Sequence, residues 1–539
     1  MSSGDSTLTT LLVGVDAACL SVLEPLFDDG ELPTLSTLFT EGAAGDLESQ
    51  IPPWTASAWP SIYTGVNPGK HGVFGFLRFE GHDWDVVNYS HVRRPSVWEL
   101  LDACGLSSVV VNVPVTNPPR PIDGAVLPGY VAPEEPTCHP PGLLADVEAE
   151  IGPYRVYAPR DGDDEQVAWY RRLTEMRGEA FRYLARRFDP DFGFLQFQQT
   201  DTVFHERPGD DEAVREVYRA VDAELAKTLS ACDPTNVLLV SDHGMGRYDG
   251  WEFRVNEYLR EHGYVTATNG GRGMPSWVTA RESRLLTGDD DTAVSPGALE
   301  RALAALARLG LTTQRAAALL DAVGLREVVA RHVPTAATRA AEQQVDFGES
   351  MVYLRDAIEL GVRINLDGRE PDGVVPPEEY EAFREELIDL LAAAETPDGD
   401  PVFDRVVPRE TYFDGPESGR AVDVVTVPRE FDVSLSTKLG GGPFGPPEEP
   451  WNHKLMGCFA AVGDAFDGAT DPGTPHIFDV APTVLSTFDR PRDERMDGEV
   501  MPVADDCGER RYELAADSRT ERTEDAEVAA RLSELGYLE

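Results

Sequence analysis

The chain alternates short, almost wholly apolar runs with longer amphipathic segments, and this alternation constrains the fold more than any other feature. The runs are rich in valine, leucine and phenylalanine, which is typical of strands buried on both faces of a parallel sheet. They lie at 8–15, 108–115, 192–197 and 236–240. Helical patterns occur at 95–103, 165–187 and 212–231. The alternation predicts an α/β fold with a central, mostly parallel sheet that is flanked by helices.

The second half of the chain continues this pattern after one interruption. Strand-like runs lie at 362–366, 421–427 and 458–462, and helical patterns lie at 378–393, 478–487 and 524–538. Residues 281–345 differ, because alanine, leucine and arginine dominate there at helical spacing. We therefore expect this segment to be a helical insertion that covers or caps the main body of the protein.

Net charge limits the partners that the chain can bind. Its 539 residues include 47 Lys or Arg and 95 Asp or Glu, which gives a formal charge of −48, and only four residues are lysine. Such a chain lacks the positive surface that general binding to nucleic acid or to an anionic membrane requires. An acid-rich, lysine-poor surface suits concentrated salt, where charges are screened over short distances. We expect a salt-adapted, halophilic protein, with an acidic surface for a specific partner as the alternative.

Cysteine spacing and the N-terminal sequence favour a soluble, cytoplasmic protein. The six cysteines are scattered without a CxxC pair, so the sequence predicts neither a disulfide framework nor a zinc ribbon. The first ten residues have neither the basic nor the apolar region of a signal peptide. Asp16 interrupts the longest apolar run, so no membrane-spanning segment is predicted. The sequence carries no signal for an oligomeric state.

Carboxylate and imidazole side chains follow three of the predicted strands. Asp16 follows the first strand, Asp201 and His205 follow the third, and Asp242 and His243 follow the fourth. A single Asp after a strand is often only a helix cap or a turn residue, but three such ends in one sheet favour a shared site. Asp oxygens together with His nitrogens suit Zn²⁺ or Mn²⁺ better than Mg²⁺ or Ca²⁺. The sequence therefore predicts a metal site at the carboxyl edge of the sheet.

Residues 51–78 contain no Asp or Glu, although the average composition of the chain predicts about five. The segment is either a buried apolar helix or a surface that meets an anion. It carries hydroxyl groups at an expected loop-to-helix junction, on Thr55, Ser57, Ser61 and Thr64. A helix N-terminus favours phosphate, and a metal ion can lower the pKa of a hydroxyl enough to make it a nucleophile. Trp54 and Trp59 are expected to pack in the wall of the site rather than to stack on a substrate.

The order of these motifs resembles that of a known family. The chain contains VGVD, PPWTASAWPSIYTGVNPGKHG, TDTVFH, VSDHGM and a late PWNHK, and further matches follow in VRINLDGREPDG and HIFDVAPTVL. Together they resemble the alkaline phosphatase superfamily and, within it, the type I phosphodiesterase/nucleotide pyrophosphatase family. The resemblance implies an alkaline-phosphatase-like catalytic core formed by 1–280 and 346–505, interrupted by the helical insertion 281–345 and followed by a helical tail, 506–539.

The resemblance also implies a site with two divalent metal ions, zinc or alternatively manganese. One ion would be held by Asp16, Asp242, His243 and the nucleophile Thr55, and the other by Asp201, His205 and His453. The implied reaction is hydrolysis of a phosphodiester or pyrophosphate bond in a small phosphorylated substrate, through a covalent phospho-threonine intermediate. His71 lies in a family motif and is interpreted as a structural residue, whereas His476 is left open.

One residue departs from the family pattern. Nucleotide pyrophosphatases of the family carry an Asn about 21 residues after the nucleophile that contacts a phosphate oxygen, and Phe76 stands at that position here. Lys70 and Arg78 are therefore candidate substrate contacts in its place. The departure leaves nucleotide specificity open, so we also consider a phosphomonoesterase or phosphotransferase that acts on a sugar or lipid head-group phosphate.

Two further readings are kept as alternatives. A sulfatase shares the fold, but it needs a Cys or Ser followed by Pro and Arg at fixed spacing, and TASAW lacks both. A metal-binding scaffold without catalytic activity would retain the ligands but would not depend on Thr55.

Overall fold

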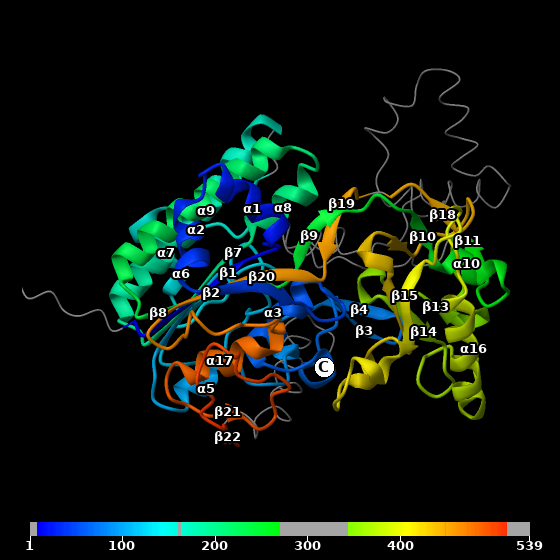
Figure 1. Cartoon of the computed structure of the whole chain (residues 1–539). Coiled ribbons are helices and arrows are strands. Elements are labelled where there is room, and N and C mark those ends of the chain that lie inside the picture. Colours follow the sequence, from blue (N-terminus) through cyan, green and yellow to red (C-terminus); the bar gives the residue numbers. More distant parts are fainter. Residues whose placement is uncertain (1–7, 160–162, 270–342, 448, 515–539) are drawn as a thin grey trace, which may run out of the picture.

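The computed structural model describes residues 8–159, 163–269, 343–447 and 449–514. A seven-stranded sheet forms its centre (Figure 1). The order across the sheet is β2 (Ala43–Glu48), β20 (Met456–Gly463), β8 (Asn236–Val240), β1 (Thr10–Val15), β7 (Phe192–Phe197), β5 (Ser108–Val111) and β6 (Gly124–Leu127). The five strands from β8 to β6 are parallel, and β20 runs antiparallel to both β8 and β2. The predicted mostly parallel sheet is thus confirmed.

Both faces of this sheet are buried, which explains the apolar runs. Alternate residues of β1 enter different hydrophobic clusters, with Leu11 and Val13 on one face and Leu12 on the other. The first face is covered by α1 (Leu20–Asp28), α2 (Pro33–Glu41), α6 (Leu143–Ile151), α7 (Asp163–Phe188) and α9 (Asp211–Cys232). The second is covered by α3 (Thr55–Thr64), α5 (Val97–Asp102) and α17 (Val480–Ser486). The continuous apolar strands are therefore a consequence of helices on both sides.

One predicted strand is shorter in the structure. The run 108–115 forms a strand only over Ser108–Val111, because Asn112 has a positive φ of 65° that ends the extended conformation. The Asn112 side-chain amide donates to the Gln196 backbone carbonyl at 3.0 Å. This contact ties the end of β5 to the neighbouring strand β7.

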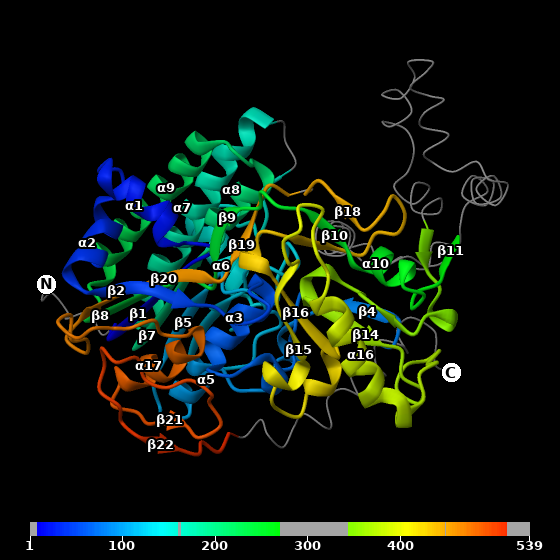
Figure 2. The same cartoon turned by 45° about the vertical axis from the view of Figure 1, so that its right-hand side comes forward.

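A second lobe lies beside the central sheet (Figure 2). Its antiparallel four-stranded sheet has the order β13 (Val352–Tyr353), β14 (Gly361–Ile364), β16 (Val424–Pro428) and β15 (Phe403–Pro408). The helix α16 (Tyr380–Ala392) packs on it around a separate hydrophobic cluster that also receives α10 (Val255–Glu261). The segment 346–505, expected to extend one catalytic core, therefore contributes to two hydrophobic cores.

Smaller elements connect the two lobes and complete the fold. They are α4 (Pro68–His71), β3 (Leu77–Glu80), β4 (Asp83–Val86), α8 (Gln199–Glu206), β9 (Gly244–Arg247), β10 (Glu252–Arg254), β17 (Ser434–Ser436), β18 (Phe444–Gly445) and β19 (Trp451–Lys454). The single-turn helices of the described residues include η4 (Ala357–Glu359), η8 (Arg429–Phe431) and η9 (Ile477–Asp479). No helix in the described part of the chain is long and apolar enough to cross a membrane.

The predicted insertion and tail fall mainly outside the described residues. Of 281–345, only Gln343–Val345 is described, and it forms β12, which pairs with β11 (Ala267–Asn269). Of 506–539, residues 506–514 are described, and β22 (Glu509–Arg510) pairs with β21 (Arg492–Asp493). The start of the predicted tail is therefore paired with the preceding segment, and the predicted helix 524–538 lies outside the described residues.

The second lobe contains a buried ion-pair network centred on Asp423. This fully buried carboxylate accepts hydrogen bonds from Arg369 at 2.6 and 2.7 Å and from Arg409 at 2.9 Å. Although burial opposes ionisation, the Arg369 and Arg363 guanidinium groups hold the pKa of Asp423 at about 2. The network joins β16 to segments on both sides of it.

We expect Asp423→Asn to lower the free energy of unfolding at pH 7 by about 3 kcal/mol, because it removes the buried negative charge that Arg369 and Arg409 share. The folded pKa of about 2 lies below the ordinary value of 3.8, so ionised Asp423 stabilises the fold by about 2 kcal/mol above pH 4. That contribution is lost as the pH falls towards 2. The difference in the free energy of unfolding between Asp423→Asn and wild type should therefore become smaller in acid. Urea unfolding at several pH values measures this free energy, with Asp389→Asn at an exposed position on α16 as the control. Equal stability of Asp423→Asn and wild type at pH 7 would contradict the stabilising role of Asp423.

Candidate metal centre

The three predicted strand ends meet at one edge of the central sheet. Strand β1 lies between β7 and β8, so the residues after these three strands are neighbours. Asp16 directly follows β1, Asp201 lies in the first turn of α8 after β7, and Asp242 and His243 follow β8. All of these residues are buried except His205, on α8, which is partly exposed. The structure therefore brings together residues that are up to 227 positions apart in the sequence.

His453 reaches this edge through a pair of short strands. Strand β19 pairs antiparallel with β9, which begins directly after His243, and the register places His453 opposite Met245. The His243 and His453 rings are stacked with their centroids 3.6 Å apart. The late histidine of the sequence thus joins the residues from the strand ends.

The first ligand group consists of Asp16, Asp242 and His243. One ligand atom from each of these buried residues lies within 4.8 Å of the others. His243 Nε2 is 3.3 Å from Asp242 Oδ2 and 3.6 Å from Asp16 Oδ1. His243 Nδ1 lies 3.0 Å from the Gly244 carbonyl oxygen, to which it donates, so Nε2 keeps its lone pair for a metal ion.

The second ligand group contains Asp201, His205 and His453. Both histidine Nε2 atoms are 3.3 Å from Asp201 Oδ1, and they are 3.0 Å from each other. His453 Nδ1 donates to the Pro53 carbonyl oxygen at 2.9 Å, which again turns Nε2 towards the site. Asp201, His243 and His453 also offer ligand atoms within 4.8 Å of one another, so the two groups are contiguous.

The donor atoms fit bound cations. Asp201 Oδ1 and Asp242 Oδ2 are buried oxygens with no hydrogen-bond partner among the described residues. Burial and the charges of Asp242 and Asp201 raise the pKa of Asp16 well above its ordinary value, and burial and Asp201 do the same for Asp242. Against the effect of burial, His205 and His453 hold the pKa of Asp201 well below its ordinary value. Buried carboxylates that repel one another beside imidazole nitrogens are an arrangement that divalent cations stabilise.

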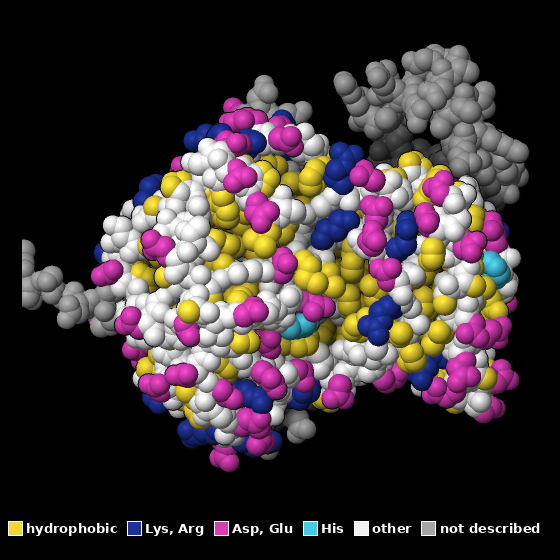
Figure 3. All heavy atoms as spheres, viewed as in Figure 1, with side chains coloured by type: hydrophobic (Ala, Val, Ile, Leu, Met, Phe, Trp, Pro, Cys, Tyr) yellow, Lys and Arg dark blue, Asp and Glu magenta, His cyan; other side chains and the backbone are white. Residues whose placement is uncertain are grey.

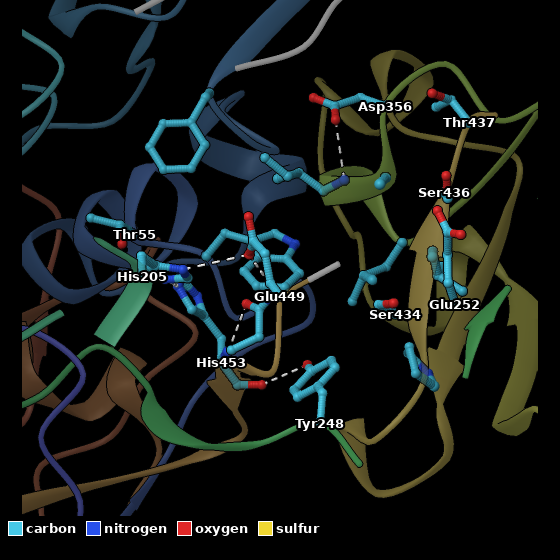
Figure 4. A pocket seen from close by; sticks show the side chains of 18 of the residues that line it. Thr55, His205, Tyr248, Glu252, Asp356, Ser434, Ser436, Thr437, Glu449 and His453 are labelled. Carbon is cyan, nitrogen blue, oxygen red and sulfur yellow. Dashed lines mark hydrogen bonds and ion pairs between the residues drawn. The ribbon is translucent and has the colours of Figure 1, made fainter. Parts of the chain in front are cut away.

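Thr55 lies against the first ligand group as the first residue of α3. Its Oγ1 is 3.5 Å from Asp16 Oδ1 and 3.4 Å from His243 Nε2. The first turn of a helix carries backbone N–H groups without intrahelical partners and a partial positive charge, both of which favour a phosphate group. Figure 4 shows Thr55 beside His205 and His453. A hydroxyl, a potential metal site and a helix N-terminus therefore share one location.

Two residues that hold Asp16 in place were not predicted. Trp59, expected only to pack, is fully buried and also donates from Nε1 to Asp16 Oδ2 at 2.8 Å. Gly14 permits this approach, because a Cβ at that position would lie 2.5 Å from the Trp59 ring. Gln196 donates to the same Asp16 oxygen at 2.9 Å. The signal for Gln196 was present in the sequence, since it is the one polar residue in the apolar run FGFLQF.

Glu449 is a further residue that sequence reasoning missed. Its Oε2 lies 3.5 Å from His205 Nδ1, on the side of the ring away from Asp201. Against the effect of burial, Asp201 and Glu449 together raise the pKa of His205 well above its ordinary value. Glu449 lies only four residues before His453, so the acidic residues that precede PWNHK were the available signal.

A cavity of about 600 Å³ opens beside Thr55 and the second ligand group, Asp201, His205 and His453. Trp54, Phe76, Tyr130 and Tyr248 line the cavity, as do residues from η4 and β17 of the second lobe. Figure 4 shows Thr55 and His453 on one side of the cavity and Ser434 on the other. Phe76 is thus at the cavity, as its position after Thr55 suggests. The cavity extends well beyond the ligand groups towards the second lobe.

The two cations expected to replace the missing Asn lie elsewhere. Neither Lys70 nor Arg78 lines the cavity. Lys70, on α4, forms an ion pair with Asp497, and Arg78 pairs with Glu80 at 3.1 Å. Both residues are close to Thr55 in the sequence, but Lys70 on α4 points towards the C-terminal segment that contains Asp497. His71 is fully buried and lies 2.9 Å from Ser61 Oγ, which agrees with a structural role.

The sequence model of the type I phosphodiesterase / nucleotide pyrophosphatase family matches residues 10–453. The chain belongs to this family. The match begins with strand β1, which leads to Asp16, and ends at His453, so it spans both ligand groups. The predicted family of phosphoric ester hydrolases is confirmed. No curated protein sequence matches the chain.

Two crystal structures of phosphonoacetate hydrolase from Sinorhizobium meliloti 1021 are similar to the chain over 88% of its length and 94% of theirs. The complex with phosphonoformate has a TM-score of 0.51 at 19% identity, and the complex with phosphonoacetate has a TM-score of 0.50 at 17% identity. At this identity the similarity shows the fold. The predicted alkaline-phosphatase-like fold is therefore confirmed.

Proposed function

We propose that this family member is a two-metal phosphodiesterase in which Thr55 is the nucleophile. The observation that carries the proposal is the position of Thr55 Oγ1, within 3.5 Å of both Asp16 and His243 at the start of α3. The hydroxyl lies beside two contiguous ligand groups and opens to a cavity large enough for a small phosphorylated substrate.

The ligand groups suggest which residues hold each metal ion. Asp16, Asp242, His243 and Thr55 would hold one ion, and Asp201, His205 and His453 the other. Their mixture of carboxylate and imidazole favours zinc, with manganese as the alternative. When bound, the ions would lower the pKa of the Thr55 hydroxyl and neutralise charge on the phosphoryl oxygens.

The residues of the chain perform a two-step displacement. The Thr55 hydroxyl gives its proton to water in the cavity, and Oγ1 bonds to phosphorus while the bond from phosphorus to the leaving oxygen breaks. The leaving group takes up a proton and departs as an alcohol or, from a pyrophosphate, as a phosphate. Water then cleaves the bond between Oγ1 and phosphorus, which restores the Thr55 hydroxyl and releases the second product. Throughout, the first turn of α3 directs backbone N–H groups at the anionic oxygens.

Trp59 and Gln196 serve the reaction by fixing the Asp16 carboxylate. Each donates a hydrogen bond to Asp16 Oδ2, which leaves Oδ1 turned towards Thr55 and His243. The Nδ1 hydrogen bonds of His243 and His453 to backbone carbonyls fix these rings in the same way. Such supporting contacts change metal affinity or activity by about 10- to 100-fold when they are removed.

Hydrolysis of simple esters tests this function. With zinc or manganese in a buffer of high salt, we expect kcat/KM for bis(p-nitrophenyl) phosphate to exceed that for p-nitrophenyl phosphate by about tenfold or more, because the cavity extends past the ligand groups to hold a second ester group. Activity on the monoester alone would show a phosphomonoesterase instead. Activity on p-nitrophenyl sulfate alone would show a sulfatase.

A further inference from the structure

The wall of the cavity opposite Thr55 carries polar groups that no step of the proposed reaction uses. It is formed by Asp356, by η4, and by the residues of β17 and the following segment. The single-turn helix η4 and the strand β17 pack against each other within the second lobe. Figure 4 shows Asp356, Ser434, Ser436 and Thr437 on this side, with Thr55, His205 and His453 across the cavity. We call this wall, Asp356–Ile358 with Ser434–Thr437, the distal wall.

Asp356 is the most unusual residue of the distal wall. Its side chain is only 5% exposed. Oδ1 accepts a hydrogen bond from the Ile358 backbone N–H at 3.2 Å, whereas Oδ2 is buried without a hydrogen-bond partner among the described residues. A buried carboxylate oxygen without a partner costs stability, so it is retained where a ligand supplies the partner.

The neighbouring arginine does not supply this partner. Arg355 is held by Glu359 through two hydrogen bonds of 2.6 and 2.7 Å. Burial and the nearby Glu359 charge raise the pKa of Asp356 to about 7. The Arg355 charge opposes this rise but does not cancel it, and Oδ2 keeps no hydrogen-bond partner among the described residues, so a cation arriving in the cavity would stabilise the ionised carboxylate.

The other groups around the cavity define the ligand more closely. Ser434 Oγ is a second buried atom without a hydrogen-bond partner among the described residues. Glu252 and Glu449 add further carboxylates to the lining. Among the described lining residues there is no arginine, and the one lysine, Lys438, lies 2.9 Å from Glu252. An anionic group such as a further phosphate would meet repulsion here, whereas a cationic hydrogen-bond donor would satisfy Asp356 Oδ2 and favour its ionised form.

We propose that the distal wall recognises a primary ammonium group on the substrate, with Asp356 Oδ2 as its ion-pair partner and the hydroxyls of Ser434–Thr437 as further acceptors. The inference rests on the proposed function and names its substrate class, which is phosphodiesters of amino alcohols. A primary ammonium group has three N–H donors, so it can satisfy both the carboxylate and a hydroxyl oxygen. The phosphate would lie at Thr55, and the alkyl chain would cross the apolar middle of the cavity near Phe76 and Ile358.

A series of p-nitrophenyl aminoalkyl phosphates with two to six carbons tests this proposal. Each is compared with the alkyl and the hydroxyalkyl diester of the same length. At one length we expect kcat/KM for the amino compound to exceed that for the alkyl compound by about tenfold or more, because a charge-assisted hydrogen bond forms only with the ammonium group. Asp356→Asn should bring this ratio to about one.

The ratio is taken within one preparation, so partial unfolding of a variant does not change it. Asp389→Asn on α16 makes the same change of charge at an exposed position outside the cavity and should leave the ratio as in wild type. Equal efficiency for all three ester types would overturn the proposal while the diesterase function stands. A preference for the hydroxyalkyl esters, or an amino preference that survives in Asp356→Asn, would overturn it as well.

A binding measurement separates this proposal from the proposed function. If no diester is cleaved, the proposed reaction is wrong, but the distal wall can still be tested with aminoalkyl methylphosphinates, in which carbon replaces both ester oxygens and no bond can be hydrolysed. Calorimetry on the metal-loaded chain should show about tenfold tighter binding of the best amino compound than of its alkyl counterpart, and a loss of this difference in Asp356→Asn. Equal affinities would overturn the ammonium subsite.

Discussion

Thr55→Ala is expected to lower kcat/KM for bis(p-nitrophenyl) phosphate by about a thousandfold or more, because it removes the atom that attacks phosphorus. In the structure Thr55 Oγ1 is the hydroxyl that lies within 3.5 Å of both Asp16 and His243. Stability should change little, since the residue loses only a hydroxyl and a methyl group at the edge of the cavity. Steady-state kinetics in the presence of zinc or manganese measure the effect.

Two variants sharpen this prediction. Thr55→Ser keeps the nucleophilic oxygen and should retain measurable activity. Ser57→Ala removes a hydroxyl from the same helix, but that hydroxyl donates to the Val73 carbonyl oxygen at 2.9 Å and does not contact the ligand groups. Mass spectrometry of acid-quenched wild-type enzyme should find the phosphoryl adduct on the peptide that contains Thr55. Undiminished turnover by Thr55→Ala, with no adduct in wild type, would exclude a covalent mechanism.

The meeting of Asp16, Asp201, Asp242 and His243 at one edge of the sheet could be predicted from the sequence because it follows from strand order. Once β1, β7 and β8 are buried parallel strands, their carboxyl ends must share one edge, and the residues that follow them are drawn together. His453 is different, because its place depends on the pairing of β19 with β9, and only the family resemblance indicated it. The residues after the strands were thus predicted from strand order, and His453 was predicted from the family resemblance.

The substrate side of the cavity could not be predicted in the same way. Phe76, Asp356 and Ser434 come from three segments that meet only through the packing of the second lobe against the central sheet. The strands of that lobe are two to six residues long, which is too short for a clear alternating pattern. Residue burial, and not residue type, distinguishes Asp356 from the many other carboxylates in the chain.

The acidity of the chain also has a clearer meaning in the structure. Asp and Glu side chains are spread over both lobes on the face shown in Figure 3, while hydrophobic side chains gather between the lobes. Asp16, Asp201 and Asp242 differ from these surface carboxylates because they are at least 93% buried. Each also lies in one of the two contiguous ligand groups. Most carboxylates of the chain are therefore solvated surface groups, whereas these three form the buried cluster that we propose binds cations.

Removal of the metal ions is expected to have the second large effect. Chelation should lower kcat/KM by about a thousandfold, since the proposed ions would contribute several kcal/mol to stabilising charge in the transition state. His453→Asn and Asp242→Asn should each lose about one bound ion, measured by elemental analysis, because each affects a different ligand group. His262→Asn, an exposed histidine after α10, should retain two ions per chain. Two tightly bound ions in both ligand variants would contradict the assignment.

The stability of the metal-free protein tests the same proposed metal site without an activity measurement. Asp16 and Asp242 lie buried together, and without a cation their charges and their loss of solvent oppose folding. Asp242→Asn removes one of these charges, so the metal-free variant should unfold at a higher urea concentration than the metal-free wild type. With zinc the order should reverse, because binding to the folded state stabilises wild type in proportion to its higher affinity. A crossover of this kind requires that the carboxylate be held in the fold for the ion, since a purely structural Asp242 would make the variant the less stable protein under both conditions.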